Sequence, residues 1–119
     1  MNNWLYEGRP FEPPEEFNPD VWYGFVYCIT NRANARQYIG KKFFWKAKTL
    51  PITKKRKRRQ RLKVESDWRT YYGSNKHLQN DVETMGEDFF HREIIHLCKS
   101  KGECAYLETK EQFAREVLL

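Results

Sequence analysis

The sequence has few cysteines and no long apolar run, and each of these features excludes a class of protein. Only three cysteines occur, Cys28, Cys98 and Cys104, and no Cys-x-x-Cys pair is present. An odd number of thiols without paired spacing is typical of reduced cysteines in a cytosolic protein rather than of a secreted disulfide scaffold. No stretch approaches the ~20 apolar residues of a membrane span, and the N-terminus lacks the charged and apolar segments of a signal peptide. We therefore expect a cytoplasmic protein without a membrane partner.

The composition that remains is that of one small folded domain. The chain has 119 residues, of which 39% are hydrophobic and 16% aromatic. This length corresponds to a single domain of ordinary size. Aromatic side chains bury a large area each, so a small core is possible without disulfide bonds.

Positive charge is concentrated in one segment, residues 54–63. It carries eight positive charges, and subtracting these from the net charge of +6 leaves −2 for the rest of the chain. A focused basic patch attracts phosphates better than a diffuse one, so we expect nucleic acid as the partner. A solvated charge run or a localisation signal is the alternative. The basic residues are Lys54, Lys55, Arg56, Lys57, Arg58, Arg59, Arg61 and Lys63.

The first twenty residues differ from the rest in composition. Prolines at positions 10, 13, 14 and 19 disfavour regular helix. We expect residues 1–20 to form an irregular arm whose aromatic side chains cover the body. The remaining residues, 21–119, form the main domain, interrupted by a basic insertion over residues 46–65.

Two strands joined by a short turn are predicted at the start of the main domain. Residues 21–30 and 36–44 are rich in β-branched and aromatic side chains, and residues 31–35 contain two turn-forming asparagines. In an antiparallel pair Tyr27 and Tyr38 fall roughly opposite one another, so both phenol groups share a face. Gly40 indicates a bulge or a close approach of the backbone.

The later segments complete an α+β pattern. The insertion 46–65 reads as a loop, or as a loop running into a short helix. A helix capped by Ser74 or Asn75 is predicted to end near Met85, before Gly86. A third strand covers residues 88–98, and a last helix starts near Lys101 or Gly102. The fold class is therefore α+β, with a small three-stranded, mainly antiparallel sheet flanked by helices.

The last helix carries a carboxylate on its buried side. With Leu107 at the centre of the apolar stripe, Glu111 falls about 40° away and Glu108 about 100° away, at the edge of the stripe. An unpaired carboxylate within the apolar arc is costly, so Glu111 needs a partner. That partner is either a metal ion, for which oxygen ligands are suited, or a lysine or arginine of the sheet.

With these residues identified, the chain resembles the GIY-YIG nuclease family, most closely its phage-encoded, homing-endonuclease-like members. Gly24-Phe25-Val26-Tyr27 stands where that family has its first motif, and Tyr38-Ile39-Gly40 matches the second at the usual spacing. Residues 111–115 stand where the family carries a metal-binding glutamate, and residues 66–74 look like sequences of the phage relatives. The resemblance covers residues 22–118.

The resemblance implies hydrolysis of DNA with one divalent cation, Mg²⁺ or Mn²⁺. By that likeness Glu111 holds the metal ion, Tyr27 orients or activates the attacking water, and Tyr38 lies beside it. The family also places an arginine after the second motif, and Arg69 is the candidate here. Arg58, Arg59 and Arg61 are rivals. No asparagine follows the last helix, and Asn75 is one candidate to replace the asparagine that family members often carry there.

Further residues are candidates for contact with DNA, and alternatives stay open. Lys41 and Lys42 follow the second tyrosine motif, and His77 lies on the helix after Gly73, so all three are candidate phosphate contacts. The phage likeness predicts the cytoplasm of an infected bacterium as the site of action. The main alternative is a module of the same fold that binds nucleic acid without cutting it. The spacing of the histidines and cysteines matches no zinc pattern, and His91 and His96, an odd number apart, should face opposite sides of a strand.

Overall fold

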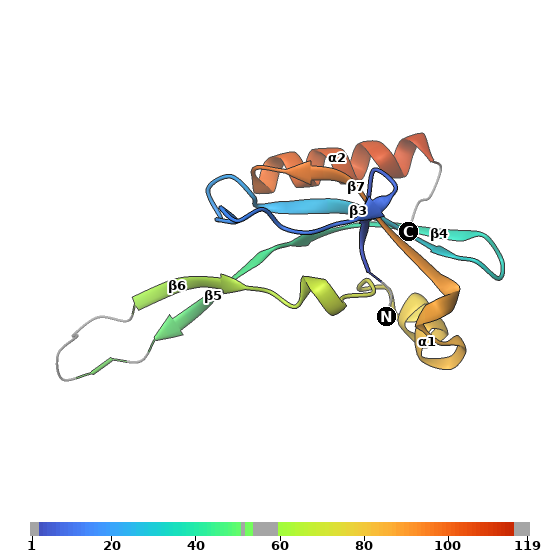
Figure 1. Cartoon of the computed structure of the whole chain (residues 1–119), viewed down its shortest axis with the longest axis horizontal. Helices are drawn as coiled ribbons and strands as arrows, with labels where there is room; N and C mark the ends of the chain where they lie inside the picture. The colour runs from blue at the N-terminus through green and yellow to red at the C-terminus, as the bar shows by residue number, and fades with distance from the viewer. Residues whose placement is uncertain (1–2, 51, 54–59, 116–119) are drawn as a thin grey trace.

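A mixed five-stranded sheet, a separate two-stranded ribbon and two α-helices make up the fold (Figure 1). The structure is a computed structural model that describes residues 3–50, 52–53 and 60–115. The strand order in the large sheet is β2-β1-β7-β3-β4. The α+β class is as predicted, but the sheet has five strands rather than the three expected.

The three central strands are antiparallel and form the core of the sheet. β3 (Gly24–Asn31) lies between β4 (Arg36–Phe43) and β7 (Phe90–Cys98). The predicted hairpin is present, but Tyr27 pairs with Gly40 and Tyr38 pairs with Ile29. The two tyrosines are therefore diagonal neighbours rather than directly opposite. An offset of two residues keeps both side chains on the same face.

The two additional strands come from the N-terminal arm, which is not irregular throughout. β1 (Leu5–Tyr6) pairs in parallel with β7, and β2 (Arg9–Pro10) pairs with β1 at the edge of the sheet. Glu7 and Gly8 both have positive φ values, as a tight two-residue hairpin turn requires. Strands of two residues carry no readable alternation in the sequence, which explains why the arm looked irregular.

Each face of the sheet has its own covering layer. α2 (Lys101–Ala114) packs Cys104 and Leu107 against Val26 and Cys28 on one face. The other face is covered by aromatic residues of the arm, by Trp68 and by α1 (Lys76–Met85). Among the described residues, no helix is long and apolar enough to span a membrane.

The caps of the helices are close to those predicted. The Asn75 side chain accepts a hydrogen bond from the backbone N–H of Leu78 at 3.1 Å and caps α1. Gly86, with φ 95°, ends that helix. Ser100 caps α2 by accepting from the backbone N–H of Glu103 at 3.1 Å.

The described ends of the basic insertion form strands, where a loop or a loop running into a short helix was expected. β5 (Trp45–Leu50) and β6 (Gln60–Glu65) pair in antiparallel fashion and extend away from the large sheet (Figure 1). Apolar and polar residues alternate over residues 45–48 and 62–65, but each stretch is short and lies next to the basic run, so the sequence read as a loop.

A β-bulge in β7 changes which residues share a face. The register with β3 shifts so that Val26 faces His96 and Tyr27 faces Ile94, which leaves Ile95 as the extra residue. Thr30 pairs with His91. Because the bulge absorbs one residue, His91 and His96 lie on the same face, the one that α2 covers, and not on opposite faces as their odd spacing suggested.

Candidate active site

A cleft at the outer edge of β4 brings together the two motif tyrosines. We call it the tyrosine pocket; its volume is about 420 Å³. Its wall is built from β3, β4, the base of the ribbon, the segment that leads into α1, and one residue of α2. The lining residues are Tyr27, Tyr38, Ile39, Gly40, Lys41, Lys42, Phe43, Trp45, Lys46, Ser66, Asp67, Ser74, Asn75, Leu78 and Glu108.

Tyr27 is held firmly in the floor of this pocket. Its ring lies over Gly40, where any Cβ would overlap the phenol, so the glycine of the second motif makes room for the tyrosine of the first. The hydroxyl is hydrogen-bonded to Tyr71 and Ser74. Burial raises the pKa of Tyr27 well above its ordinary value, and negative charge on Tyr71 and Glu108 would add to the effect. The phenol is therefore neutral near pH 7 and acts as a hydrogen-bonding group.

Tyr38 presents a hydroxyl group of a different kind. It is buried, and its oxygen has no hydrogen-bond partner in the part of the chain that the structure describes. A buried hydroxyl without a partner is costly to leave unsatisfied. Tyr38 itself forms part of the wall of the tyrosine pocket.

Glu108 supplies the carboxylate of the pocket, although it belongs to the helix on the opposite face of the sheet. β4 is the edge strand, so a side chain on the flank of α2 reaches past it. The Lys41 Nζ lies 3.0 Å from Oε1 of Glu108. One turn further along, the Gln112 Nε2 donates to the backbone carbonyl of Ile39 at 3.1 Å and ties the helix to the same strand.

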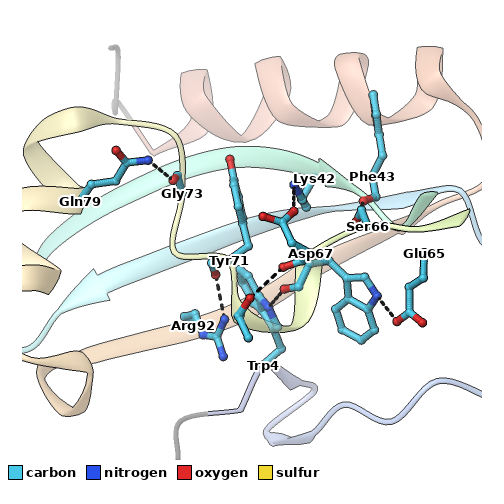
Figure 2. Close-up of polar contacts among 12 residues, drawn as sticks. Trp4, Lys42, Phe43, Glu65, Ser66, Asp67, Tyr71, Gly73, Gln79 and Arg92 are labelled. Atoms are coloured by element: carbon cyan, nitrogen blue, oxygen red, sulfur yellow. Dashed lines mark hydrogen bonds and ion pairs between the residues drawn. The ribbon is translucent and has the colours of Figure 1, made fainter. Parts of the chain in front are cut away.

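A second ion pair forms the opposite wall. The Lys42 Nζ lies 2.6 Å from the Asp67 carboxylate and 4.2 Å from the centre of the Tyr71 ring (Figure 2). The hydrogen bond from Lys42 lowers the pKa of Asp67. Because Lys46 also lines the cleft, three ammonium groups face two carboxylates, and the pocket has a net positive charge suited to phosphate.

Hydrogen bonds to neighbouring elements hold the segment between the ribbon and α1 in place over the sheet (Figure 2). The Ser66 hydroxyl donates to the backbone carbonyl of Phe43 at 2.6 Å. Arg92 donates to the carbonyl of Tyr71 at 2.8 Å, and the Gln79 amide donates to that of Gly73 at 2.9 Å. These contacts position Tyr71 and Ser74, which in turn hold the hydroxyl of Tyr27.

Glu111, the predicted metal ligand, does not line the tyrosine pocket. It lies on the α2 side of the sheet, where Oε1 is 2.8 Å from His96 Nε2 and Oε2 is 3.0 Å from Arg115 Nε. The hydrogen bonds from His96 and Arg115 lower the pKa of Glu111. Its observed partners are thus a histidine of the sheet and an arginine of its own helix.

Arg69, the predicted arginine, lines a different cavity of about 370 Å³ beside Trp4 and Trp68. Its Nε lies 2.8 Å from Glu65, and its guanidinium stacks on the Trp68 ring at 4.6 Å. No described arginine lines the tyrosine pocket. The basic groups there are lysines, two of which, Lys41 and Lys42, the sequence predicted as phosphate contacts.

The other predicted contacts are dispersed. His77 lies on the exposed side of α1, 3.0 Å from Arg36 and 3.5 Å from Asp81, and does not line the pocket. Asn75 does line it. Lys63 is exposed on the ribbon, and the side chain of Arg61 is not described. The other six predicted contacts lie outside the described residues: Lys54, Lys55, Arg56, Lys57, Arg58 and Arg59.

Sequence reasoning missed Glu108, although one signal pointed to it. On the helix it occupies the edge of the apolar stripe, about 100° from Leu107. Where a helix packs beside an edge strand, this flank is the part that overhangs the strand. The sequence did not reveal which strand would be the edge, so the flank appeared to be solvent.

The donor set of the tyrosine pocket fits a hydrated divalent cation shared with substrate. No cluster of three or more potential protein ligands exists among the described residues. Mg²⁺ is commonly held by one or two carboxylates together with water and substrate phosphates rather than by a full protein cage. Glu108 provides one such carboxylate, and Tyr38, whose hydroxyl has no described partner, lines the same cleft.

A family model described as "Putative endonuclease segE, GIY-YIG domain" matches residues 4–119. The match therefore includes the N-terminal strands as well as the tyrosine hairpin and α2. No curated protein and no solved structure shows significant similarity to the chain.

Proposed function

Because the chain belongs to the GIY-YIG nuclease family, we propose that it is an endonuclease that hydrolyses phosphodiester bonds in DNA, with its active centre in the tyrosine pocket. The observation that carries this proposal is that Tyr27, Tyr38 and Glu108, from three separate elements, line one positively charged cleft. We further propose that it acts in the cytoplasm of a phage-infected bacterium.

In this mechanism Glu108 would hold a divalent cation, Mg²⁺ or Mn²⁺. The cation would supply positive charge that polarises the phosphate and acidifies water. This assigns the metal to Glu108 in place of Glu111, since Glu111 is engaged by His96 and Arg115 away from the cleft. Lys41, which is paired with Glu108 in the structure, would then contact the phosphate.

The two tyrosines orient the reacting groups. The hydroxyl of Tyr38 accepts or donates a hydrogen bond to the attacking water, because it has no other described partner. Tyr27 is neutral and fixed by Tyr71 and Ser74, so it positions the phosphate rather than accepting a proton. Water forms a new P–O bond as one ester P–O bond breaks; the proton that the water loses passes to solvent, and the departing oxygen takes up a proton from solvent.

Lysines stabilise the negative charge on the phosphate, a role that we predicted for an arginine from the sequence. Negative charge builds up on the phosphate in the transition state, and cations placed beforehand in a cleft stabilise it. Lys42 is held between Asp67 and the Tyr71 ring, so its ammonium group is fixed before substrate binds. A lysine offers a point charge rather than the two parallel hydrogen bonds of a guanidinium.

Incubation of the purified chain with supercoiled plasmid tests this proposal. Nicked or linear DNA should appear with Mg²⁺ or Mn²⁺, disappear with a chelator, and fall at least about 100-fold in rate in Glu108→Gln. Undiminished cleavage in that variant would refute the assigned site. Binding of DNA without cleavage under any divalent metal would instead favour the alternative of an inactive nucleic-acid-binding module.

A further inference from the structure

The ribbon formed by β5 and β6 has two open faces. Six residues of each strand pair along its length, and it extends away from the body of the protein (Figure 1). The described side chains along the ribbon are exposed on both strands beyond its base: Lys46, Ala47, Lys48, Thr49, Leu62 and Lys63. A two-stranded hairpin without a covering layer gains little stability from its own contacts. The exposed faces of such a ribbon can therefore be covered only by a binding partner.

Positive charge lies on both faces of this ribbon. Lys46 pairs with Val64 and Lys48 with Leu62, which places these two lysines on one face. Lys63 pairs with Ala47 and lies on the other face. Among its described side chains the only acid is Glu65, which sits at the base and is engaged by Trp68 and Arg69. A ribbon with lysines on both faces is electrostatically complementary to a polyanion that carries negative charge on both sides of it.

The ribbon is continuous with the tyrosine pocket. Trp45 and Lys46 belong to β5 and also line the cleft. Ser66 and Asp67, which line the opposite side, directly follow the end of β6. A polyanion seated in the cleft therefore passes onto the ribbon without a break.

We propose that the ribbon inserts into the major groove of duplex DNA, with Lys46, Lys48 and Lys63 contacting phosphates on the two groove walls, and so presents one strand to the tyrosine pocket. Insertion of the ribbon into the groove stands by itself, and only the presentation of one strand to the tyrosine pocket rests on the proposed function. Two strands lie ~4.8 Å apart, and with side chains the ribbon is about 10 Å wide. The major groove, ~12 Å wide, admits a two-stranded β-ribbon, whereas the minor groove, ~6 Å wide, is too narrow.

The length of the ribbon limits its reach along the duplex. Six residues of β-strand extend about 20 Å, which corresponds to about six base pairs of B-DNA.

The test measures binding of a 30-base-pair duplex by fluorescence anisotropy over a range of salt, with a chelator present so that no DNA is cut. The ribbon variant is Lys46→Gln/Lys48→Gln/Lys63→Gln. The matched control is Lys99→Gln/Lys101→Gln/Lys110→Gln, which removes the same charge from exposed positions on and next to α2. Unfolding curves of both variants should overlay that of the unmodified chain, because all six side chains are exposed.

The ribbon variant should bind at least about 30-fold more weakly at 0.1 M salt, and its salt slope should fall by about 2.7, the value for three lost phosphate contacts. The control should lose less than about 3-fold. Equal losses in the two variants, or an unchanged salt slope in the ribbon variant, would overturn the proposal.

A second pair of measurements tests the groove. Methylation of guanine N7, which lies in the major groove, should weaken binding by the unmodified chain, whereas saturation with a minor-groove ligand such as distamycin should not. The reverse pattern would refute major-groove insertion. Ribbon-dependent binding without metal-dependent cleavage would reject the proposed endonuclease but keep the ribbon. Cleavage and binding that do not respond to the ribbon variant would reject the ribbon alone.

Discussion

The ammonium group of Lys41 lies 3.0 Å from the carboxylate of Glu108, so an edge strand and a helix from the covered face of the sheet meet at one ion pair. This contact places a carboxylate of α2 in the pocket that Tyr27 and Tyr38 line from the opposite face. The arrangement depends on β4 having no neighbouring strand on its outer side in the part of the chain that the structure describes. A further strand there would separate Glu108 from the tyrosines.

Glu108→Gln and Glu111→Gln should behave differently. Loss of the Glu108 carboxylate removes the proposed cation ligand, and we expect the rate of plasmid nicking to fall at least about 100-fold. Glu111→Gln should keep the rate within about 3-fold, because its carboxylate contacts His96 and Arg115 outside the pocket. Nicking rates of both variants measured at saturating Mg²⁺ test this prediction. A larger loss of nicking rate in Glu111→Gln than in Glu108→Gln would indicate that Glu111 is the metal ligand.

Tyr38→Phe should separate activity from stability. Its hydroxyl has no described partner, so its removal should leave the free energy of unfolding unchanged or raise it by up to about 1 kcal/mol, while nicking falls at least about 10-fold. Tyr27→Phe removes a hydroxyl bonded to Tyr71 and Ser74, and should cost about 1 kcal/mol of stability as well as activity. Urea denaturation and nicking assays on the same preparations measure both quantities. A Tyr38→Phe variant that is fully active would remove this residue from the mechanism.

Gly40→Ala should disrupt the floor of the tyrosine pocket. The new Cβ would overlap the phenol of Tyr27, and we expect a loss of about 1–3 kcal/mol in the free energy of unfolding. Nicking should fall because Tyr27 is displaced. Gly102→Ala is the control, since no atom lies within 4 Å of its new Cβ and alanine favours the helix by up to about 1 kcal/mol. If the two variants were equally stable, the close contact at Gly40 would be disproved.

Acid should weaken the fold partly through Glu111. His96 and Arg115 hold the pKa of Glu111 below its ordinary value, so its ionised form stabilises the folded state. This contribution is fully present above the unfolded pKa of ~4.3 and is lost as the pH falls through the folded pKa. The free energy of unfolding should therefore drop more steeply below pH 4.5 in the unmodified chain than in Glu111→Gln. The exposed Glu83→Gln should retain the full slope, and a parallel slope in Glu111→Gln would contradict the linkage.

Local signals were sufficient to locate most elements of the central fold. The aromatic and β-branched runs around Tyr27 and Tyr38 predicted the hairpin, and Asn75 and Gly86 marked the two ends of α1. The arm strands and the ribbon escaped prediction for physical reasons. Two-residue strands have no periodicity, and the alternation in the ribbon strands covers only a few residues beside a basic run that resembles a loop.

The candidate site could be predicted only in part from the sequence. Tyr27 and Tyr38 were found because their spacing and their strands are local properties. Glu111 was chosen because it stands where the resemblance places a metal-binding glutamate and because it falls within the apolar arc of the isolated helix. In the structure that burial reflects contacts with His96 and Arg115.

The sequence by itself determined the family, the tyrosine hairpin and the concentration of positive charge, because motifs, strand preference and charge are carried by neighbouring residues. The tertiary structure decided which carboxylate meets the tyrosines, which cations surround them and what shape the basic insertion takes. Those outcomes depend on which strand lies at the edge of the sheet and on which flank of α2 overhangs it. Contacts of this kind join residues as far apart as Lys41 and Glu108, and no local pattern encodes them.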